Sequence, residues 1–450
     1  MLSPTLQAAW LWQHKGDLAI WEAMLHCDDS ALRLAVVRQL VEFHRADVSV
    51  ESPWMDGEVA LHWACDNGHV DLVSYLLTRP NILVNLPDQG GFAPLHVACL
   101  GGHVQVVRQL LSHTDILVNL AVQNGMTALH VACQMGHVDV VRQLLSRTDI
   151  QVNLASQAGM TPLHLACYKG HVEVMRQLLS RSDIHVNISA QGRPTPLYLA
   201  CEAGHVEVVH HLLSHTDIQV NLADQDGGTP LHMACQKGHI DIVRQLLCRT
   251  DIQVNLAEQT GRTPLHTACQ EGRVDVVCQL LSRTDIQVNP VVAGQGDLTP
   301  LHMACWRGHI GVVRQLLSRT DIQVSLADRN GISPLQMALI CGHVAVAHVF
   351  TKRAGLAVGP HTTGLTKKEI MAEYARFGLR FPGSKCDGPG CDVRPSENSK
   401  LLKCQKCQRK YYCSKACQVG LGFHACELAL RRLETGSREN REGPCTGMYY

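Results

Sequence analysis

The stretch Thr229–Arg262, TPLHMACQKGHIDIVRQLLCRTDIQVNLAEQTGR, recurs with small changes along most of the chain. The period is visible in the cysteines that follow the LHxA step, which are 34 residues apart: Cys65, Cys99, Cys133, Cys167, Cys201, Cys235 and Cys269. Cys305 follows after 36 residues, and Leu339 takes the same place 34 residues later. A fixed period of this size predicts a stack of repeated supersecondary units.

Each unit has the pattern of two short helices joined by a turn. Thr229 and Pro230 suit a helix start, because the Thr hydroxyl can accept from a free backbone N–H and Pro lacks only a donor that would be orphaned there. Gly238 suits the helix end, since glycine adopts the left-handed conformation readily. A second helix is predicted to begin at His239, with apolar residues on one stripe: Ile240, Val243, Leu246 and Leu247.

The rest of the unit is a connection to the next one. Residues 251–255 alternate in polarity like a short extended arm, and a turn around Gly261 returns the chain to the next Thr-Pro. The two helices have about nine residues each, short of the roughly 12–15 that an isolated helix needs in water. One unit therefore cannot stand alone, and its neighbours must cover its apolar faces.

The pattern TPLHxAC…GHxDVVRQLL closely resembles the ankyrin repeat. The resemblance covers residues 60–350 and implies an all-α repeat solenoid of about nine helix-turn-helix-hairpin units. A longer SRTDIQVN connection replaces the usual glycine after the second helix, so we expect the arm to be shaped differently. The units begin near Ala60, Ala93, Thr127, Thr161, Thr195, Thr229, Thr263, Thr299 and Ser333.

The segments outside the array have other predicted roles. Residues 1–59 are expected to form degenerate capping repeats, in which Trp10, Trp12 and Trp21 pack as core or, alternatively, form a peptide-binding ridge. A linker with a short helix, capped by Thr366, is predicted next. The predicted domains are 1–59, 60–350, the linker 351–385, a cysteine-rich module 386–426, and a short helix with a disordered tail over 427–450.

Composition narrows the class of protein. The chain has 40 Lys and Arg against 40 Asp and Glu, so no global charge favours nucleic acid or a membrane. The balance is uneven, because residues 351–450 hold 18 Lys and Arg against 9 Asp and Glu. We expect no secretory signal and no membrane span. The 20 cysteines fall in repeat slots or at metal-ligand spacings, which favours a reducing cytoplasm or nucleus over a disulfide-bonded secreted protein.

The histidines of the array invite a catalytic interpretation that their positions do not support. Of the 26 histidines, seven fill the slot after Leu and eight follow the turn glycine. The resemblance implies that the first kind bridges the Thr hydroxyl and neighbouring backbone, and that the second kind starts the second helix. The repeat cysteines are predicted to be small buried hydrophobes. Because the sequence has no phosphate loop, HExxH, nucleophile elbow or kinase signature, we expect no catalytic residue and no enzyme activity.

Residues that bind a partner are expected where one unit differs from the next. The resemblance implies that the residue after LH and those just after the Cys face a concave groove. Exposed aromatic residues and arginine often anchor interfaces. The predicted partner-binding residues are Trp63, Met135, Tyr168, Lys169, Glu202, Lys237, Trp306 and Arg307. Nine packed layers make a surface of roughly 80–90 Å, which suits a protein partner.

The arm asparagines carry a further resemblance. Asn153, Asn221 and Asn255 each follow a valine, in a context similar to that of ankyrin asparagines modified by an oxygen-sensing hydroxylase. The alternative is a plain turn-forming residue.

A second signal is C386-DGPG-C391-x12-C404-QK-C407-x5-C413-SKA-C417-x6-H424-A-C426. Eight soft ligands at such spacings predict zinc, which this polar stretch would need in order to fold. The run YYCSKACQ, residues 411–418, resembles the MYND zinc finger. That resemblance implies two structural zinc ions without an open position for catalysis. The first ion would have the ligands Cys386, Cys391, Cys413 and Cys417, and the second Cys404, Cys407, His424 and Cys426.

The module departs from the MYND pattern at two places. Only Ala425 separates His424 from Cys426, so both cannot face one metal from a regular helix. A non-helical turn, a water or another ligand would then complete the second site. Leu421 stands where the family has a tryptophan, which weakens the expectation of a groove for proline-rich peptides, although Gln418 is kept. A RING ligase is the nearest rival fold, but its Cys-x-His-x2-Cys centre is absent.

These features predict a non-catalytic adaptor or scaffold, in which the array binds one protein and the zinc finger engages another. The alternative is a nuclear transcriptional regulator or co-repressor adaptor whose basic zinc-finger region contacts nucleic acid. Without interleaved base-reading side chains, a solvated surface accounts better for the basic excess. A SET-type methyltransferase paired with the finger is a third class, but no residues remain to build its catalytic domain.

Overall fold

A computed structural model describes residues 3–354 of the chain except 53–56, 190–192 and 293–295. The chain divides into two compact units, Met1–Gln225 and Asp226–Tyr450. In the described residues every regular element is a helix, and extended backbone pairs only in two isolated bridges, Ala121 with Thr127 and Val292 with Leu298. The predicted all-α repeat architecture is therefore confirmed for these residues.

Unit 1 opens with a cap: α1 (Pro4–Lys15), the 3-10 turn η1 (Gly16–Leu18), α2 (Ala19–His26) and α3 (Ser30–Phe43). Side-chain oxygens of Ser3 and Asp29 accept backbone N–H groups in the first turns of α1 and α3. These helices pack on one another, and α3 packs on the first repeat.

The three tryptophans of the cap have different environments. Trp21 is fully buried, and its indole donates to the carbonyl of Val50 at 3.0 Å, as expected of a core residue. Trp12 is half-buried. Trp10 is 53 % exposed, so its predicted place in the core is wrong. Ala8 and Leu11 take the inner stripe of α1 instead, which leaves Trp10 on the solvent side.

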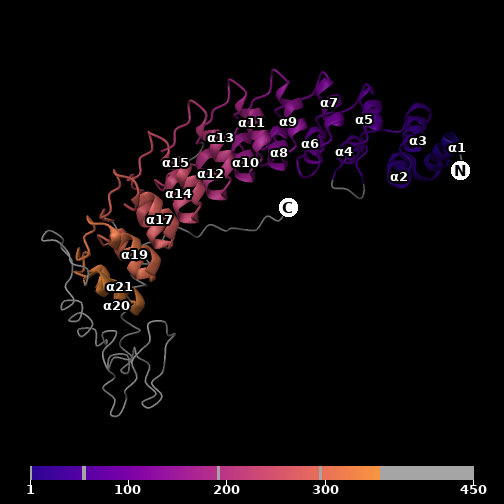
Figure 1. The fold of residues 1–450 in the computed structure, drawn as a ribbon. Helices are drawn as coiled ribbons and strands as arrows, with labels where there is room; N and C mark the ends of the chain where they lie inside the picture. Colours follow the sequence, from indigo (N-terminus) through magenta and orange to yellow (C-terminus); the bar gives the residue numbers. More distant parts are fainter. Residues whose placement is uncertain (1–2, 53–56, 190–192, 293–295, 355–450) are drawn as a thin grey trace, which may run out of the picture. The chain divides into compact units, whose positions relative to one another are not determined.

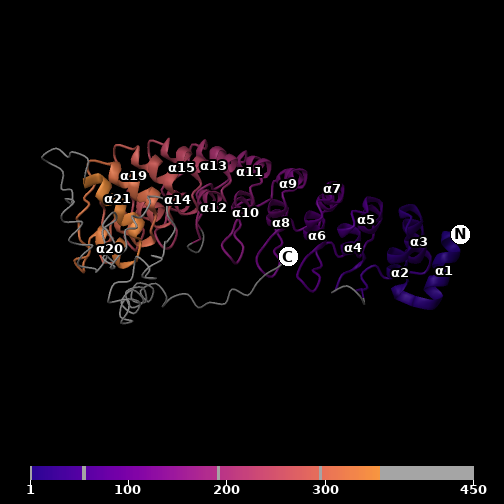
Figure 2. The same ribbon diagram turned by 60° about the horizontal axis from the view of Figure 1, so that its bottom comes forward.

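Unit 1 continues with five helix pairs. The first helices are α4 (Ala60–Asp66), α6 (Pro94–Leu100), α8 (Ala128–Met135), α10 (Pro162–Lys169) and α12 (Pro196–Ala203). The second helices are α5 (Val70–Leu77), α7 (Val104–Ser112), α9 (Val138–Leu145), α11 (Val172–Leu179) and α13 (Val206–Leu213). First helices pack along one row and second helices along another (Figure 1). In Figure 2 connections between repeats project on the side of α6, α8 and α10.

Unit 2 has four pairs of the same kind. The first helices are α14 (Pro230–Lys237), α16 (Pro264–Gln270), α18 (Pro300–Arg307) and α20 (Pro334–Ile340). The second helices are α15 (Ile240–Leu247), α17 (Val274–Leu281), α19 (Ile310–Ser318) and α21 (Val344–Ala354). Each kind again packs on its own kind in sequence order. No helix in the described part of the chain is long and apolar enough to cross a bilayer.

Local sequence explains where the helices begin and end. At α10, the Thr161 hydroxyl accepts from the backbone N–H of His164 and Pro162 takes the first helical position. Gly170 then ends the helix with φ of 78°, a left-handed conformation that side chains resist.

The arm between repeats is not a strand. Ile252 and Val254 are buried and Gln253 is exposed, so burial in the arm follows its alternation in polarity. The backbone turns on either side of this segment, however, and no partner strand pairs with it. The apolar side chains instead complete the thin core beneath, whose other members in the helices are mostly Leu, Val, Ala and Cys.

Candidate protein-binding surface

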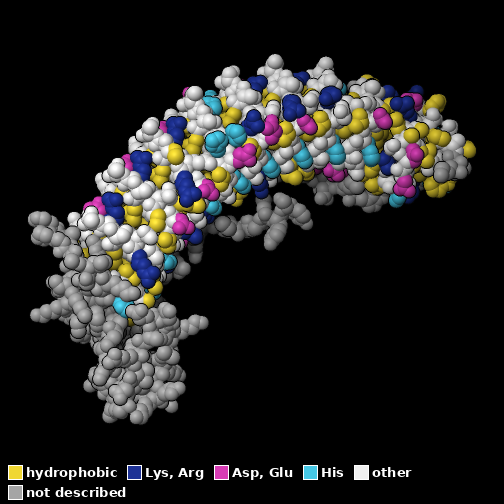
Figure 3. Space-filling model, in the orientation of Figure 1, with side chains coloured by type: hydrophobic (Ala, Val, Ile, Leu, Met, Phe, Trp, Pro, Cys, Tyr) yellow, Lys and Arg dark blue, Asp and Glu magenta, His cyan; other side chains and the backbone are white. Residues whose placement is uncertain are grey.

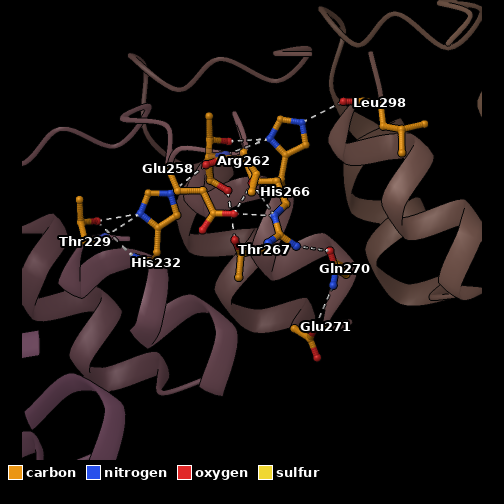
Figure 4. Close-up of polar contacts among 11 residues, drawn as sticks. Thr229, His232, Glu258, Arg262, His266, Thr267, Gln270, Glu271 and Leu298 are labelled. Carbon is orange, nitrogen blue, oxygen red and sulfur yellow. Dashed lines mark hydrogen bonds and ion pairs between the residues drawn. The ribbon is translucent and has the colours of Figure 1, made fainter. Parts of the chain in front are cut away.

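The histidine after Leu links most of the repeats that carry it to the next repeat. Thr229 donates to Nδ1 of His232 through its backbone N–H (3.2 Å) and its hydroxyl (2.9 Å), and Nε2 of His232 lies 3.1 Å from the carbonyl oxygen of Arg262 (Figure 4). Because a carbonyl only accepts, Nε2 carries the proton and Nδ1 accepts. His266 repeats the arrangement with the carbonyl of Leu298 at 3.2 Å. The predicted bridge is confirmed.

The environment of these groups is unlike that of a reactive site. Burial lowers the pKa of His130, His164 and His266 to about 4, so these imidazoles are neutral near pH 7. Burial likewise raises the pKa of the repeat thiols, among them Cys133 and Cys167, well above the usual range. In the part of the chain that the structure describes, no group of three or more His, Cys, Asp and Glu side chains could hold a metal ion.

The histidine after the turn glycine has a role that the sequence did not reveal. Its Nε2 donates to a carbonyl of the preceding repeat, as His137 does to Leu100 (3.0 Å), His171 to Gln134 (3.0 Å) and His205 to Tyr168 (2.9 Å). Figure 3 shows histidine side chains recurring along one face of the repeats of unit 1. The carbonyls that accept belong to the slot just after the repeat cysteine. These histidines therefore hold the backbone at the ends of the first helices, where the partner-binding residues are predicted.

The arms are tied together by asparagine and arginine. Nδ2 of Asn153 donates to the carbonyl of Asp183 (2.6 Å), and its Oδ1 accepts from the backbone N–H of His185 (2.9 Å) in the next arm. Asn255 makes the same two contacts in unit 2. Arg147 pairs with Asp149 and also donates to the carbonyl of Leu111 in the preceding repeat. The arm asparagines are thus clamps between repeats, a stronger constraint than the turn that the sequence suggested.

Three neighbouring first helices present one large apolar side chain each to solvent. Leu100 on α6 is 43 % exposed, and Met135 on α8 and Tyr168 on α10 are each 44 % exposed. All three lie in the last turn or end of their helices, just past the repeat cysteine. Lys169 is exposed beside them, with Nζ 5.8 Å from the centre of the Tyr168 ring. Leu100 was missed by sequence reasoning, although it occupies the same repeat slot as Tyr168.

The other predicted binding residues occupy the same slots. Glu202 on α12 is the last of these residues in unit 1, and its side chain is half-buried. In unit 2, Lys237 and Arg307 are exposed, and the Arg307 guanidinium lies 4.8 Å from the centre of the half-buried Trp306 ring. Their part in binding stays a prediction.

Trp63 has a different environment. It is only 8 % exposed, because the Arg33 guanidinium lies 5.1 Å from the centre of its ring and His69 packs at 4.9 Å. Arg33 belongs to the cap, so the cap covers the first repeat at this slot. Little of the Trp63 ring is left for a partner.

Unit 2 holds a polar network between the connection at residues 258–262 and the helix α16. Glu258 accepts from the Arg262 guanidinium at 2.5 Å and from the Thr260 hydroxyl at 2.6 Å, and Arg262 also donates to Gln270 at 3.2 Å (Figure 4). Gln270 in turn donates to Glu271 at 3.4 Å. The network joins a hairpin connection to α16.

The predicted zinc ligands lie outside the described residues. This applies to Cys386, Cys391, Cys404, Cys407, Cys413, Cys417, His424 and Cys426. The linker and the tail lie outside them too.

Comparison with known proteins identifies the class. The family profile described as ankyrin repeats (3 copies) matches residues 24–120, 83–155, 114–190, 151–224 and 197–291, and the profile of the single ankyrin repeat matches 296–329. These segments make up more than half of the sequence. The chain belongs to the ankyrin-repeat family. Neither profile reaches the cysteine-rich module in these matches, so that module stays a prediction.

Comparison with curated proteins gives no match. Among solved structures 534 chains match. One of them is the ankyrin repeat domain of Bcl-3, described as a unique member of the IkappaB protein family. It is 27 % identical, the match covers 47 % of this chain and 94 % of that chain, and the TM-score is 0.43.

Proposed function

We propose that this protein is a non-catalytic adaptor whose ankyrin repeats bind one protein while its C-terminal module engages another. The observation that carries the proposal is the row of Leu100, Met135 and Tyr168, three exposed apolar side chains on neighbouring helices. The carbonyls of Leu100 and Tyr168 accept from His137 and His205 of the next repeats, and the carbonyl of Gln134, the neighbour of Met135, accepts from His171. Large anchors on a rigid backbone lose little entropy when a partner binds.

The second half of the proposal concerns residues 386–426. We propose that they form a MYND-like zinc finger, with about two structural zinc ions held by the eight Cys and His ligands named above. Zinc would supply the folding energy that so polar a stretch lacks, about 10–16 kcal/mol in apparent binding free energy. A proline-rich peptide is a candidate ligand of the finger. The segment 351–385 would tether the two binding modules and set their effective concentration.

The proposal is tested by isolating partners of the full chain with three baits from the same cells: wild type, Met135→Ser with Tyr168→Ser, and Cys413→Ser with Cys417→Ser. One set of proteins should be lost only with the first double variant and a different set only with the second. An identical set of partners for all three baits would contradict the adaptor function. Because cytoplasm and nucleus are both proposed locations, the isolation is done from each fraction.

A nucleic-acid partner is the second candidate, favoured by the excess of 18 Lys and Arg over 9 Asp and Glu in residues 351–450. Contacts of this kind release counterions, so affinity should fall steeply as salt rises. Fluorescence anisotropy of labelled DNA and RNA against the full chain over a salt series measures this. Absence of salt-sensitive binding would remove this candidate.

A further inference from the structure

One histidine after a turn glycine bonds differently from its counterparts. His103 donates from Nε2 to the carbonyl of Asp66 at 2.7 Å, and the corresponding histidines of the next three repeats bond in the same way to the repeat before them. His69 is the first of the series, so the element before it is the cap. Its Nε2 lies 2.9 Å from Nη1 of Arg33 on α3.

This partner reverses the role of the His69 ring. A guanidinium has only donors, so Nε2 of His69 accepts, whereas Nε2 of His103 donates. Protonation of His69 would place a hydrogen on the accepting nitrogen and bring two cations together, so the contact with Arg33 requires a neutral imidazole. An imidazolium still donates from Nε2, so protonation leaves the bond of His103 in place. Of the bonds compared above, only the one at His69 is broken by protonation.

Arg33 depends on this acceptor. Its Nη2 donates to the carbonyl of Cys27 within the cap, and its Nε is buried with no hydrogen-bond partner among the residues that the structure describes. Loss of His69 would leave a second group of the guanidinium without an acceptor, which is costly for a buried donor. The same guanidinium lies 5.1 Å from the centre of the Trp63 ring, on which His69 packs at 4.9 Å. One side chain of the cap thus covers two side chains of the first repeat.

The surroundings of His69 favour its neutral form further. Burial lowers the pKa of His69, and the positive charges of Arg33 and His103 lower it more. Asp66 and Asp71, the acids nearest to it in sequence, are exposed to solvent. Because the docked cap holds this pKa below the ordinary value of about 6.5, the stabilisation of docking is complete above about pH 6.5 and is lost as pH falls.

We propose that the contact between Arg33 and His69 is a latch that holds the cap on the first repeat, and that acid opens it. Protonation of His69 separates Arg33 from the ring and uncovers Trp63, which is only 8 % exposed with the cap in place. All of these residues belong to unit 1. Trp63 is one of the predicted partner-binding residues, so an open latch would offer a partner an aromatic side chain that the closed latch hides. The latch itself does not depend on the adaptor function proposed above.

Hydroxyl-radical footprinting of the full chain, analysed residue by residue with mass spectrometry, measures the exposure of Trp63. We expect its oxidation rate to rise several-fold between about pH 7 and about pH 5.5, because His69 gains a proton as pH falls. Trp21, which is fully buried inside the cap, should stay protected at both pH values. That difference separates a cap that undocks from a cap that unfolds.

Two variants assign the effect to the latch. His69→Gln keeps an acceptor for Arg33 but cannot be protonated, so Trp63 should stay protected at both pH values. His137→Gln is the matched control, since it removes a histidine of the same series whose Nε2 donates. In this control Trp63 should respond to pH as it does in the wild type. Circular dichroism at both pH values confirms that each variant keeps the helix content of the wild type.

An unchanged oxidation rate of Trp63 in the wild type would overturn the proposal. An equal rise in His69→Gln would also overturn it, because other groups would then loosen the cap. A parallel rise at Trp21 would mean that the cap unfolds, which contradicts a latch. Because no partner takes part in the measurement, its outcome leaves the partner isolation above unaffected.

Discussion

Thr161 and His164 show how one residue pair holds a repeat in place. The backbone N–H of Thr161 donates to Nδ1 at 3.1 Å, its hydroxyl donates at 2.8 Å, and Nε2 donates to the carbonyl of Pro194 at 3.0 Å. Protonation would replace the lone pair of Nδ1 with a hydrogen facing two donors. Only the neutral imidazole fits, and burial disfavours the charged form further, so the pKa of His164 falls to about 4.

The array should therefore lose stability in mild acid. The pKa of His130, His164 and His266 is about 4 in the folded protein, lower than the value of about 6.5 in the unfolded chain. Their contribution to the free energy of unfolding is therefore complete above pH 6.5 and is lost as pH falls toward 4. Each contributes about 3 kcal/mol at most across that range. Thermal unfolding followed by circular dichroism should show the midpoint falling between pH 7 and pH 5.

Glutamine provides a control that the chain itself supplies. Gln336 takes the histidine slot in the last repeat, and its Oε1 accepts from the backbone N–H of Ser333 at 2.8 Å. Replacing His130, His164 and His266 together by Gln keeps an acceptor but removes the titration. The thermal unfolding midpoint of the variant should fall less between pH 7 and pH 5 than that of the wild type. An unchanged pH dependence would mean that other groups cause it.

At the scale of the element, the turn between the two helices depends on the next repeat. Gly136 has φ of 80°, and a Cβ there would lie 2.6 Å from Cε1 of the His171 ring. The glycine is needed both for its backbone conformation and for the space that the imidazole fills. Gly342 has φ of 78° at the same slot of the last repeat, where a Cβ would meet nothing within 4 Å.

These two glycines separate the two requirements. Gly342→Ala should destabilise by about 1–2 kcal/mol, the strain of an alanine in the left-handed conformation. Gly136→Ala should destabilise the protein by about 1–3 kcal/mol more than Gly342→Ala does. The reason is that His171 must move and weaken its bond to Gln134. Urea denaturation of both variants measures the difference. Equal losses would show that the ring contact contributes nothing.

The arm clamps can be tested in the same way. Asn153→Ala removes the bonds to Asp183 and His185, each worth about 1 kcal/mol, so we expect a loss of about 1–3 kcal/mol. Asn153→Asp keeps the acceptor and loses the donor, so it should be intermediate. Gln151→Ala, an exposed neighbour, is the control and should change the unfolding midpoint little.

At the scale of the whole molecule, stability is divided between packing in the repeats and the proposed metal in residues 386–426. The described residues depend on layers of Leu, Val, Ala and Cys and on bonds between repeats, and they hold no cluster that could bind a metal. The cysteine-rich segment has few apolar residues and eight soft ligands. The two parts should therefore respond independently to chelation.

Elemental analysis of the full chain purified under reductant should find about two zinc ions per chain. A strong chelator should remove them and make residues 386–426 sensitive to protease, because metal binding supplies their folding energy. The thermal midpoint of the helical repeats should stay the same. About one ion would support an incomplete site at His424 and Cys426, and none would refute the zinc module.

Much of the candidate surface followed from sequence because the slots repeat. Met135, Tyr168, Lys169 and Arg307 are exposed at the ends of first helices, where the repeat slot places them. Leu100 could have been found by the same rule, as it shares the slot of Tyr168. Trp63 could not be assigned in this way, because its burial comes from Arg33 in a cap whose sequence does not follow the repeat.

The repeat helices, the residues that begin and end them and the apolar slots were predictable from the sequence, because each depends on residues within one 34-residue period. Contacts between repeats were not. The bond from His103 to the carbonyl of Asp66 spans 37 residues, and the clamp from Asn153 to Asp183 spans 30. Such bonds depend on how one layer lies on the next. That stacking decides which side chains become clamps and which are left exposed.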